Sequence, residues 1–456
     1  MGGGLFQLVA YGVEDLVITH NPEVTYFKMV FKRHTNFTSE SIPQNFVGKV
    51  NFGRRVNSII SKNGDLISGL CLQVTLPKIP QDPTGECVYS WVKNIGHVLI
   101  KNVSIEIGGQ VIDKHYGDWL HIWNELTCPI DKKDGMNIML GNIEQIYDFN
   151  EHIKKDIDEY VCYIPLNFWF CKSPNLALPL IALKYHEVKI NVEFEELENC
   201  LLKADVNFGN ANTTETRYQS NISGVEYLSN IANLQAKLYI DCLFLDKTER
   251  EMFSTKTHEY CIEQLQYNDV TDFLGDLSSV RLNFNHPIKE LIWVFQYDEN
   301  IYIKDFYNYT NTMTTYKITI ENNGTPNFTT VKSNSNPENP VESVNLIING
   351  NNRFEEQTGE YTNYIQQYYY HTNISINGIN TYSFALHPEN IQPSGTYNFS
   401  KVEDAILENK LKTYYLNNSL NGESNIASGM GLVKIYGVNY NILKITGGMG
   451  GIVFSN

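Results

Sequence analysis

The chain has 456 residues, of which 42% are hydrophobic and 19% are charged, and its net charge is −16. The length predicts two globular domains of roughly 200 residues each, and the composition excludes a disordered chain. The acidic balance argues against nucleic-acid binding, because such a protein needs a basic surface that displaces counterions from phosphate.

The first predicted element is a helix that begins after Asn21 and ends near His34. Asn21 is a suitable N-cap, and Val24, Phe27 and Phe31 recur at the spacing of one helix face. Basic residues at the end of this helix are Lys28, Lys32, Arg33 and His34. We interpret these charges as compensation of the helix dipole and not as a binding patch.

Short apolar or alternating runs broken by turn residues follow the helix and predict strands. Asn63-Gly64 and Gly108-Gly109 predict hairpin turns, because these residues tolerate positive φ. A second helix is predicted from an apolar stripe at helical spacing, formed by Trp119, Ile122, Trp123 and Leu126. Such a stripe is typical of core packing.

Strands are predicted again over residues 189–194 and 236–245, where apolar residues alternate or dominate. Asp246, with Glu249 three residues later, predicts a helix cap that opens a linker between two domains. The strand pattern restarts at His258. Later predicted strands are residues 280–284, 290–295, 344–348, 382–386 and 440–445.

Three polar stretches rich in Asn, Thr and Gly interrupt the two halves, at residues 207–223, 321–340 and 349–380. Loops of this length are uncommon unless they carry function or lie on an exposed surface. We predict that they are insertions at one end of each domain.

The fold class predicted by these elements is all-β. The chain contains 29 Tyr and 22 Phe, which favour strands, and its many Asn residues favour turns. No segment of about 20 apolar residues is present, and the N-terminus lacks the profile of a signal peptide. The eight cysteines form no CxxC pair, which is typical of small buried side chains in a reducing compartment.

Three common motifs of metal, phosphate and nucleophile sites are absent. The sequence contains no HExxH zinc motif, no GxxxxGK[ST] phosphate loop and no GxSxG nucleophile elbow. We therefore predict no catalytic, cofactor-binding or metal-binding residues, no cofactor and no enzymatic activity.

Several longer sequence segments together resemble those of the major capsid proteins of nucleocytoplasmic large DNA viruses, the phycodnavirus, marseillevirus and mimivirus groups. Those in the first half are Gly4-Leu-Phe-Gln-Leu-Val-Ala-Tyr-Gly12, Asn21-Pro-Glu-Val-Thr-Tyr-Phe-Lys28, Tyr116-Gly-Asp-Trp119 and Ile164-Pro-Leu-Asn-Phe-Trp-Phe170. Those in the second half are His258-Glu-Tyr260, Tyr382-Ser-Phe-Ala-Leu386, Gln392-Pro-Ser-Gly395 and Gly450-Gly-Ile-Val-Phe-Ser-Asn456. The resemblance covers the chain from end to end.

The resemblance implies a double jelly roll, with two tandem eight-stranded β-sandwiches and a few short helices. The implied domains are an N-terminal arm (1–23), a first jelly roll (24–246), a linker (247–257) and a second jelly roll (258–456). It also implies a homotrimer that fills a pseudo-hexameric position in the icosahedral shell of the virion.

Further implied partners are neighbouring capsomers, minor capsid and penton proteins and, indirectly, an internal membrane layer, with assembly in the host cytoplasm. Direct nucleic-acid binding is not expected, and surface glycans are left open. Two other functions fit the same fold, a glycan-binding attachment protein and a capsid-assembly scaffold that is absent from mature particles.

Overall fold

The structure of the chain is a computed structural model. It describes residues 3–10, 12–85, 87–205, 231, 233–268, 271–274, 276–320, 326–332, 336–375, 378–416, 425–427 and 430–455. These residues fall into two compact units, Met1–Phe37 and Thr38–Asn456.

The N-terminal unit contains two short helices, α1 (Gly3–Val9) and α2 (Val13–Thr19). The helix predicted between Asn21 and His34 is wrong, because residues 21–34 are all described and none is helical. Its intended apolar face, Val24, Phe27 and Phe31, is 71%, 98% and 79% exposed. A short amphipathic helix draws most of its stability from burying that face, and the described residues of this unit leave the face exposed. The basic residues therefore do not close a helix, and that interpretation is also wrong.

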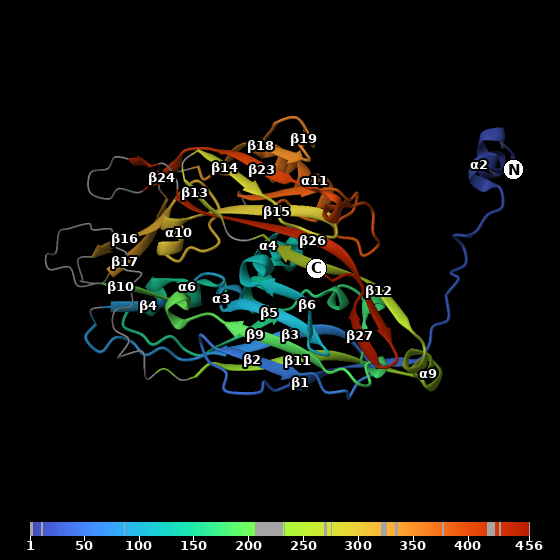
Figure 1. Cartoon of the computed structure of the whole chain (residues 1–456), viewed down its shortest axis with the longest axis horizontal. Coiled ribbons are helices and arrows are strands. Elements are labelled where there is room, and N and C mark those ends of the chain that lie inside the picture. The colour runs from blue at the N-terminus through green and yellow to red at the C-terminus, as the bar shows by residue number, and fades with distance from the viewer. Residues whose placement is uncertain are drawn as a thin grey trace. The chain divides into compact units, whose positions relative to one another are not determined.

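The first sandwich of the larger unit consists of two antiparallel sheets (Figure 1). One sheet has the strand order β1 (Phe37–Gln44), β11 (Gln235–Leu245), β3 (Leu66–Leu76) and β7 (Tyr160–Pro165), with β8 (Leu178–Pro179) beside β3. The other has the order β2 (Arg55–Ile59), β9 (Val188–Phe194), β5 (Ile100–Ile107) and β6 (Gln110–Tyr116). The chain passes from one sheet to the other at most steps, which is the winding of a jelly roll.

The second sandwich repeats this winding. One sheet has the order β12 (His258–Tyr267), β26 (Met430–Thr446), β15 (Pro287–Tyr297) and β21 (Ile379–Ser383), extended by β13 (Thr271–Leu274), β22 (Tyr397–Asn398) and β27 (Met449–Ile452). The other contains β14 (Leu277–Arg281), β23 (Ala405–Leu411), β18 (Val341–Ile348), β19 (Asn351–Asn352) and β20 (Gln357–Thr358). The predicted double jelly roll is confirmed.

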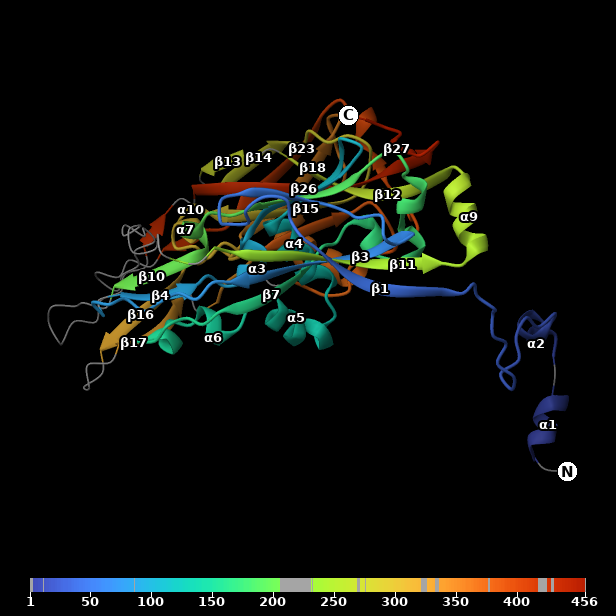
Figure 2. The same ribbon diagram turned by 90° about the horizontal axis from the view of Figure 1, so that it is seen from below.

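Three further strand pairs extend from the sandwiches. They are β4 (Cys87–Trp91) with β10 (Leu201–Asp205), β16 (Thr314–Ile320) with β17 (Pro326–Lys332), and β24 (Tyr414–Leu416) with β25 (Asn425–Ala427). Figure 2 shows the first two pairs at one end of the larger unit and helix α9 (Lys247–Thr255) at the other. Asp246 caps α9 by accepting a hydrogen bond from the Glu249 amide at 2.9 Å, as predicted.

Short helices connect the strands. In the first sandwich they are α3 (Ile95–Val98), α4 (Gly117–Thr127), α5 (Lys133–Met139), α6 (Glu144–Tyr147), α7 (Leu197–Cys200), η1 (Ile130–Lys132), η2 (Phe149–His152), η3 (Trp169–Cys171), η4 (Pro174–Leu176) and η5 (Leu180–Ala182). In the second they are α10 (Asp298–Tyr302), the π-helical turn η6 (Tyr361–Ile365), α11 (Gln366–Tyr370) and η7 (Phe399–Lys401). The predicted helix over residues 119–126 is confirmed as α4.

Two turn predictions have different outcomes. Gly108-Gly109 joins β5 to β6 with positive φ at both glycines, as predicted. The hairpin predicted at Asn63-Gly64 is wrong, because the strands on either side, β2 and β3, belong to opposite sheets. A jelly roll crosses between its sheets here, and the turn residues alone do not distinguish a crossing from a hairpin.

Two of the polar stretches that were predicted as loops contain strands or helices in their described residues. Residues 326–332 form β17, and residues 349–380 contain η6 and α11. These elements were not predicted, because the many Asn and Thr residues leave neither stretch with a clear apolar period. Residues 207–223 lie outside the described part of the chain.

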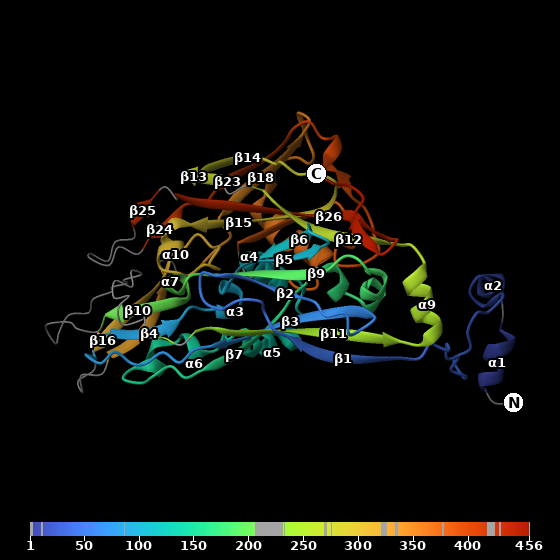
Figure 3. The same ribbon diagram turned by 60° about the horizontal axis from the view of Figure 1, so that its bottom comes forward.

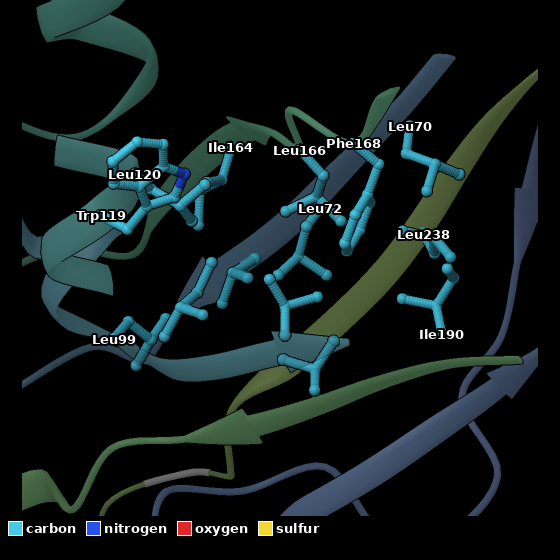
Figure 4. Close-up of a cluster of buried hydrophobic side chains, with 14 of the residues drawn as sticks. Leu70, Leu72, Leu99, Trp119, Leu120, Ile164, Leu166, Phe168, Ile190 and Leu238 are labelled. Atoms are coloured by element: carbon cyan, nitrogen blue, oxygen red, sulfur yellow. The ribbon is translucent and has the colours of Figure 1, made fainter. Parts of the chain in front are cut away.

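The largest cluster of buried side chains continues from the first sandwich into the second. Figure 4 shows its centre, where Leu72 of β3, Ile190 of β9 and Leu238 of β11 converge. Ile292 and Val294 of β15 belong to this cluster, whereas Leu291 and Trp293 of the same strand pack in the second sandwich's own cluster. Strand β15 therefore serves both clusters through its two faces.

Candidate functional site

No metal centre is formed by the residues that the structure describes, where no three His, Cys, Asp or Glu side chains converge to hold an ion. The predicted lack of catalytic and cofactor sites stays a prediction. No helix in the described ranges is long and apolar enough to cross a membrane. The geometry most informative about function lies at the seam between the sandwiches and on exposed faces.

Helix α4 of the first sandwich lies between the strands of the two sandwiches (Figures 1 and 3). Trp119 is buried and its ring lies 5.4 Å from that of Tyr436 on β26, measured between centroids. The rings of Tyr116 and Tyr267 are 5.0 Å apart beside it. Aromatic pairs of this kind contribute about 1 kcal/mol each beyond the area they bury.

Polar contacts cross the same seam. Asp118 of α4 forms an ion pair with Lys434 of β26. Asp113 accepts a hydrogen bond from the backbone amide of Leu265 at 3.0 Å. A mixed apolar and polar interface of this kind favours one relative placement of the two sandwiches.

A buried ion network lies at one edge of α4. Lys289 has no solvent exposure, and its Nζ lies 2.6 Å from Oε1 of Glu263, which also pairs with Lys172. Burial alone would raise the pKa of Glu263, but the two lysines outweigh it and hold that pKa below its ordinary value. Burial, with the nearby Lys172, lowers the pKa of Lys289. Both lysines also lie over the ring of Trp123.

A second buried cluster fastens α11 to β15. The ring of His371, just after α11, lies between Glu290 of β15, with Nε2–Oε2 at 3.3 Å, and Glu389, with Nδ1–Oε1 at 3.1 Å. Burial alone would lower the pKa of His371, but its contacts with the two carboxylates raise that pKa to about 9. The imidazolium is therefore the form that this pocket stabilises at neutral pH.

Two further histidines lie in the seam without charge. The rings of His97 and His121 are 5.9 Å apart, and His121 stacks on Tyr307 with centroids 4.0 Å apart. Burial lowers the pKa of His121 to about 4. Both side chains are neutral at physiological pH, so they act as packing groups.

The cysteines are all free. Cys162, Cys200 and Cys242 are buried, as predicted, and burial raises the pKa of Cys162 to about 12. Cys261 is exposed, where the prediction of a buried side chain is wrong. It lies on β12, whose outward positions face solvent.

Sequence reasoning missed the charged clusters. Lys289 and Glu290 stand next to each other at the start of the long apolar run of β15, and that was the available signal. Two charges at the start of a central strand can stay buried only if partners reach them from other segments. The partners Glu263 and His371 are remote in sequence, which no local pattern discloses.

The chain is similar to known proteins over its whole length. The model described as "Major capsid protein N-terminus" matches residues 25–246, and the model described as "Large eukaryotic DNA virus major capsid protein" matches residues 249–451. The major capsid protein of Phaeocystis pouchetii virus is 36% identical, with 100% of both chains covered. That of Paramecium bursaria Chlorella virus 1 is 34% identical, also with 100% of both chains covered.

Solved structures give the same result. A chain from the PBCV-1 virus capsid quasi-atomic model matches with a TM-score of 0.72 at 32% identity, over 95% of this chain and 100% of that one. The Faustovirus major capsid protein matches with a TM-score of 0.70 at 14% identity, over 96% and 94% of the two chains. The second likeness shows the fold alone.

Proposed function

The chain belongs to the major capsid protein family of large eukaryotic DNA viruses, and from that premise we propose that three copies of it form a pseudo-hexameric capsomer of an icosahedral virion shell. The observation that carries this proposal is the repetition of one jelly-roll winding twice along a single chain. Three such chains around a threefold axis present six similar walls, which suits a sixfold lattice position.

The division into domains follows from the same repetition. We assign residues 1–23 to an N-terminal arm, 24–246 to the first jelly roll, 247–257 to the linker and 258–456 to the second. The end of β11 at Leu245 and the start of β12 at His258 support this division, with α9 between them.

The proposed partners are those of a shell. Neighbouring capsomers would contact the outer walls, and minor capsid and penton proteins would contact the base, above an internal membrane layer that the chain touches only indirectly. Assembly would take place in the host cytoplasm. The net charge of −16 supports a role without direct nucleic-acid contact.

Surface glycans stay a proposal, and the structure narrows where they could attach. Asn308 and Asn373 both begin Asn-x-Ser/Thr triplets. The Asn308 side-chain amide donates to the Thr312 carbonyl at 2.9 Å, and that of Asn373 donates to the Cys128 carbonyl. Attachment would replace one of the two amide hydrogens and place a sugar where the amide now lies against the backbone, so we expect both to be unmodified.

The test of this function is the amount of the chain in purified virions, measured by quantitative mass spectrometry. A capsid-building protein should dominate the protein mass of the particle. A chain that is abundant in infected cells but nearly absent from mature particles would contradict the proposal and identify an assembly scaffold of the same fold.

A further inference from the structure

The central strands of the two jelly rolls can be compared position by position through their strand register. Strands β3 and β15 occupy the same place in the winding, and each has 11 residues. Counted from their first residues, Cys71 corresponds to Ile292 and Gln73 to Val294. This register is consistent with burial, because Leu70 and Leu72 then match Leu291 and Trp293, which all face their own sandwich's core.

The neighbouring strands carry equivalent residues at this register. On β26, Lys434 pairs with Val294 and Tyr436 with Ile292. On β11, Lys237 pairs with Gln73 and Tyr239 with Cys71. A lysine and a tyrosine therefore occupy the same two positions on both sheets.

The helices that follow β6 and β20 correspond in the same way. Helix α4 begins Gly117-Asp118-Trp119. The helical segment that continues into η6 and α11 begins Gly359-Glu360-Tyr361. A side chain on Gly117 would collide with the carbonyl oxygen of Ile100, the first residue of β5. A side chain on Gly359 would collide with that of Val341, the first residue of β18. Both helices thus start against the same point of their sandwich.

Within the chain, the first helix docks on the second sandwich's sheet through Asp118–Lys434 and Trp119–Tyr436. The equivalent surfaces are not joined to each other. On the sheet side, Lys237 is exposed, and Val161 and Tyr163 of β7 are 36% and 40% exposed. On the helix side, Ile365 is 46% and Tyr368 70% exposed.

We propose that the segment from Glu360 to Tyr368 of one copy packs on the outer face of β3, β11 and β7 of a second copy. Glu360, which pairs with Lys412 of its own chain at 3.3 Å, would face Lys237 as Asp118 faces Lys434. Tyr361, which is half-buried against its own sandwich's cluster, would approach Tyr239 as Trp119 approaches Tyr436. This inference rests on the proposed capsomer and names the surface that builds it.

The shape and chemistry of the receiving face support a second copy as the occupant. A groove of about 730 Å³ lies on it, lined by Gln73, Thr75 and Lys237 among others. The equivalent positions Gln296 and Lys434 line the cavity of about 280 Å³ that the start of α4 enters in the seam. The charges are complementary, and exposed tyrosines are enriched at protein interfaces. Because the two surfaces differ, the contact is head-to-tail, and in the proposed capsomer three such contacts complete a ring.

A charge exchange tests the contact in the full-length chain. The variants Lys237→Glu and Glu360→Lys each place like charges together, and we expect trimer dissociation to begin at concentrations at least about tenfold higher than for the native chain. Glu360→Lys also loses the 3.3 Å ion pair of Glu360 with Lys412 in its own chain. The double variant restores an opposite pair across the contact and should recover the part of the loss that comes from the contact. Mass photometry across a dilution series measures all three, and far-UV circular dichroism checks the fold.

The matched control is Lys410→Glu. It breaks the exposed 2.9 Å pair of Lys410 on β23 with Glu342 on the neighbouring strand β18, and it should leave the trimer unchanged. Tyr368→Ser, compared with Tyr302→Ser on α10, tests the apolar part and should also weaken the trimer. A native trimer whose stability no interface variant changes would overturn this inference alone. A native chain that stays monomeric would overturn the proposed capsomer as well.

Discussion

Lys289 and Glu263 are charged residues buried between the two sandwiches, and their contribution to stability depends on their pairing with each other. The side chains are 0% and 9% exposed, and their charged atoms are 2.6 Å apart. Removing one partner of such a pair strands the other charge in a low-dielectric site, which costs more than the pair contributes. The network therefore favours one specific placement of the two sandwiches against each other.

Replacing Lys289 by Met should lower the free energy of unfolding by about 3–5 kcal/mol, because Glu263 loses one of its two cationic partners. Lys444→Met provides the matched control, since Lys444 forms an exposed pair with Glu259 at 2.7 Å on the adjacent strand. That control should cost no more than about 1 kcal/mol. Chemical denaturation compares the two; equal losses would contradict the importance of burial.

The His371 cluster predicts a pH dependence. Its pKa is raised from 6.5 to about 9 in the folded chain, so its contribution is complete below pH 6.5 and is lost as the pH rises through 9. A shift of this size corresponds to at most about 3 kcal/mol. The double variant Glu290→Gln with His371→Gln should therefore lose less stability between pH 6.5 and 9 than the native chain.

The measurement is the midpoint of urea unfolding at a series of pH values, with His20→Gln in the exposed N-terminal unit as control. The control should follow the native curve. Parallel curves for the native chain and the double variant would show that His371 does not carry the dependence.

At the scale of elements, the start of α4 is where the seam is most tightly defined. Gly117 faces the carbonyl groups of His97 and Ile100 so closely that a methyl group has no room, whereas Gly135 of α5 faces open space. Gly117→Ala should destabilise the chain by about 1–3 kcal/mol through overpacking. Gly135→Ala should stabilise it by up to about 1 kcal/mol, because alanine is the better helix former.

Thermal unfolding of the two glycine variants checks this prediction, since opposite shifts in melting temperature are expected. A stable Gly117→Ala chain would mean that the helix start can move away from β5. In that case the correspondence with Gly359 would lose its physical basis.

Two segments with similar apolar stripes at helical spacing show how far the sequence predicts the fold. Trp119, Ile122 and Trp123 formed a helical stripe, and α4 exists because the second sandwich covers it. Val24, Phe27 and Phe31 formed an equally regular stripe, but these side chains stay exposed and residues 21–34 form no helix. Periodicity reports the capacity to bury a face, and tertiary contacts decide whether burial occurs. The strands of the central sheets were predictable because their apolar pattern is local. The partners of Lys289 and His371 were not predictable, because they come from segments remote in sequence.

At the scale of the whole molecule, the N-terminal unit should matter for the shell and not for the capsomer. Helix α2 has no buried residues, and Val17 and Ile18 are 90% and 82% exposed. We expect that removing residues 1–20 leaves trimers intact but abolishes shell assembly. Val17→Asp with Ile18→Asp should act like the truncation, and Glu14→Gln should not.

Electron microscopy of particles assembled with each of these variants measures the effect. Closed shells formed at native yield by the truncated chain would contradict a role of this segment in assembly. Loss of the trimer on truncation would instead place the segment within the capsomer.

The central claim is that one chain with two jelly rolls builds a capsomer from three copies. The mass of the purified recombinant chain in solution tests it most directly, measured by sedimentation equilibrium or mass photometry. Three chains of 52.2 kDa predict a stable species of about 157 kDa. A strict monomer at high protein concentration would contradict the account.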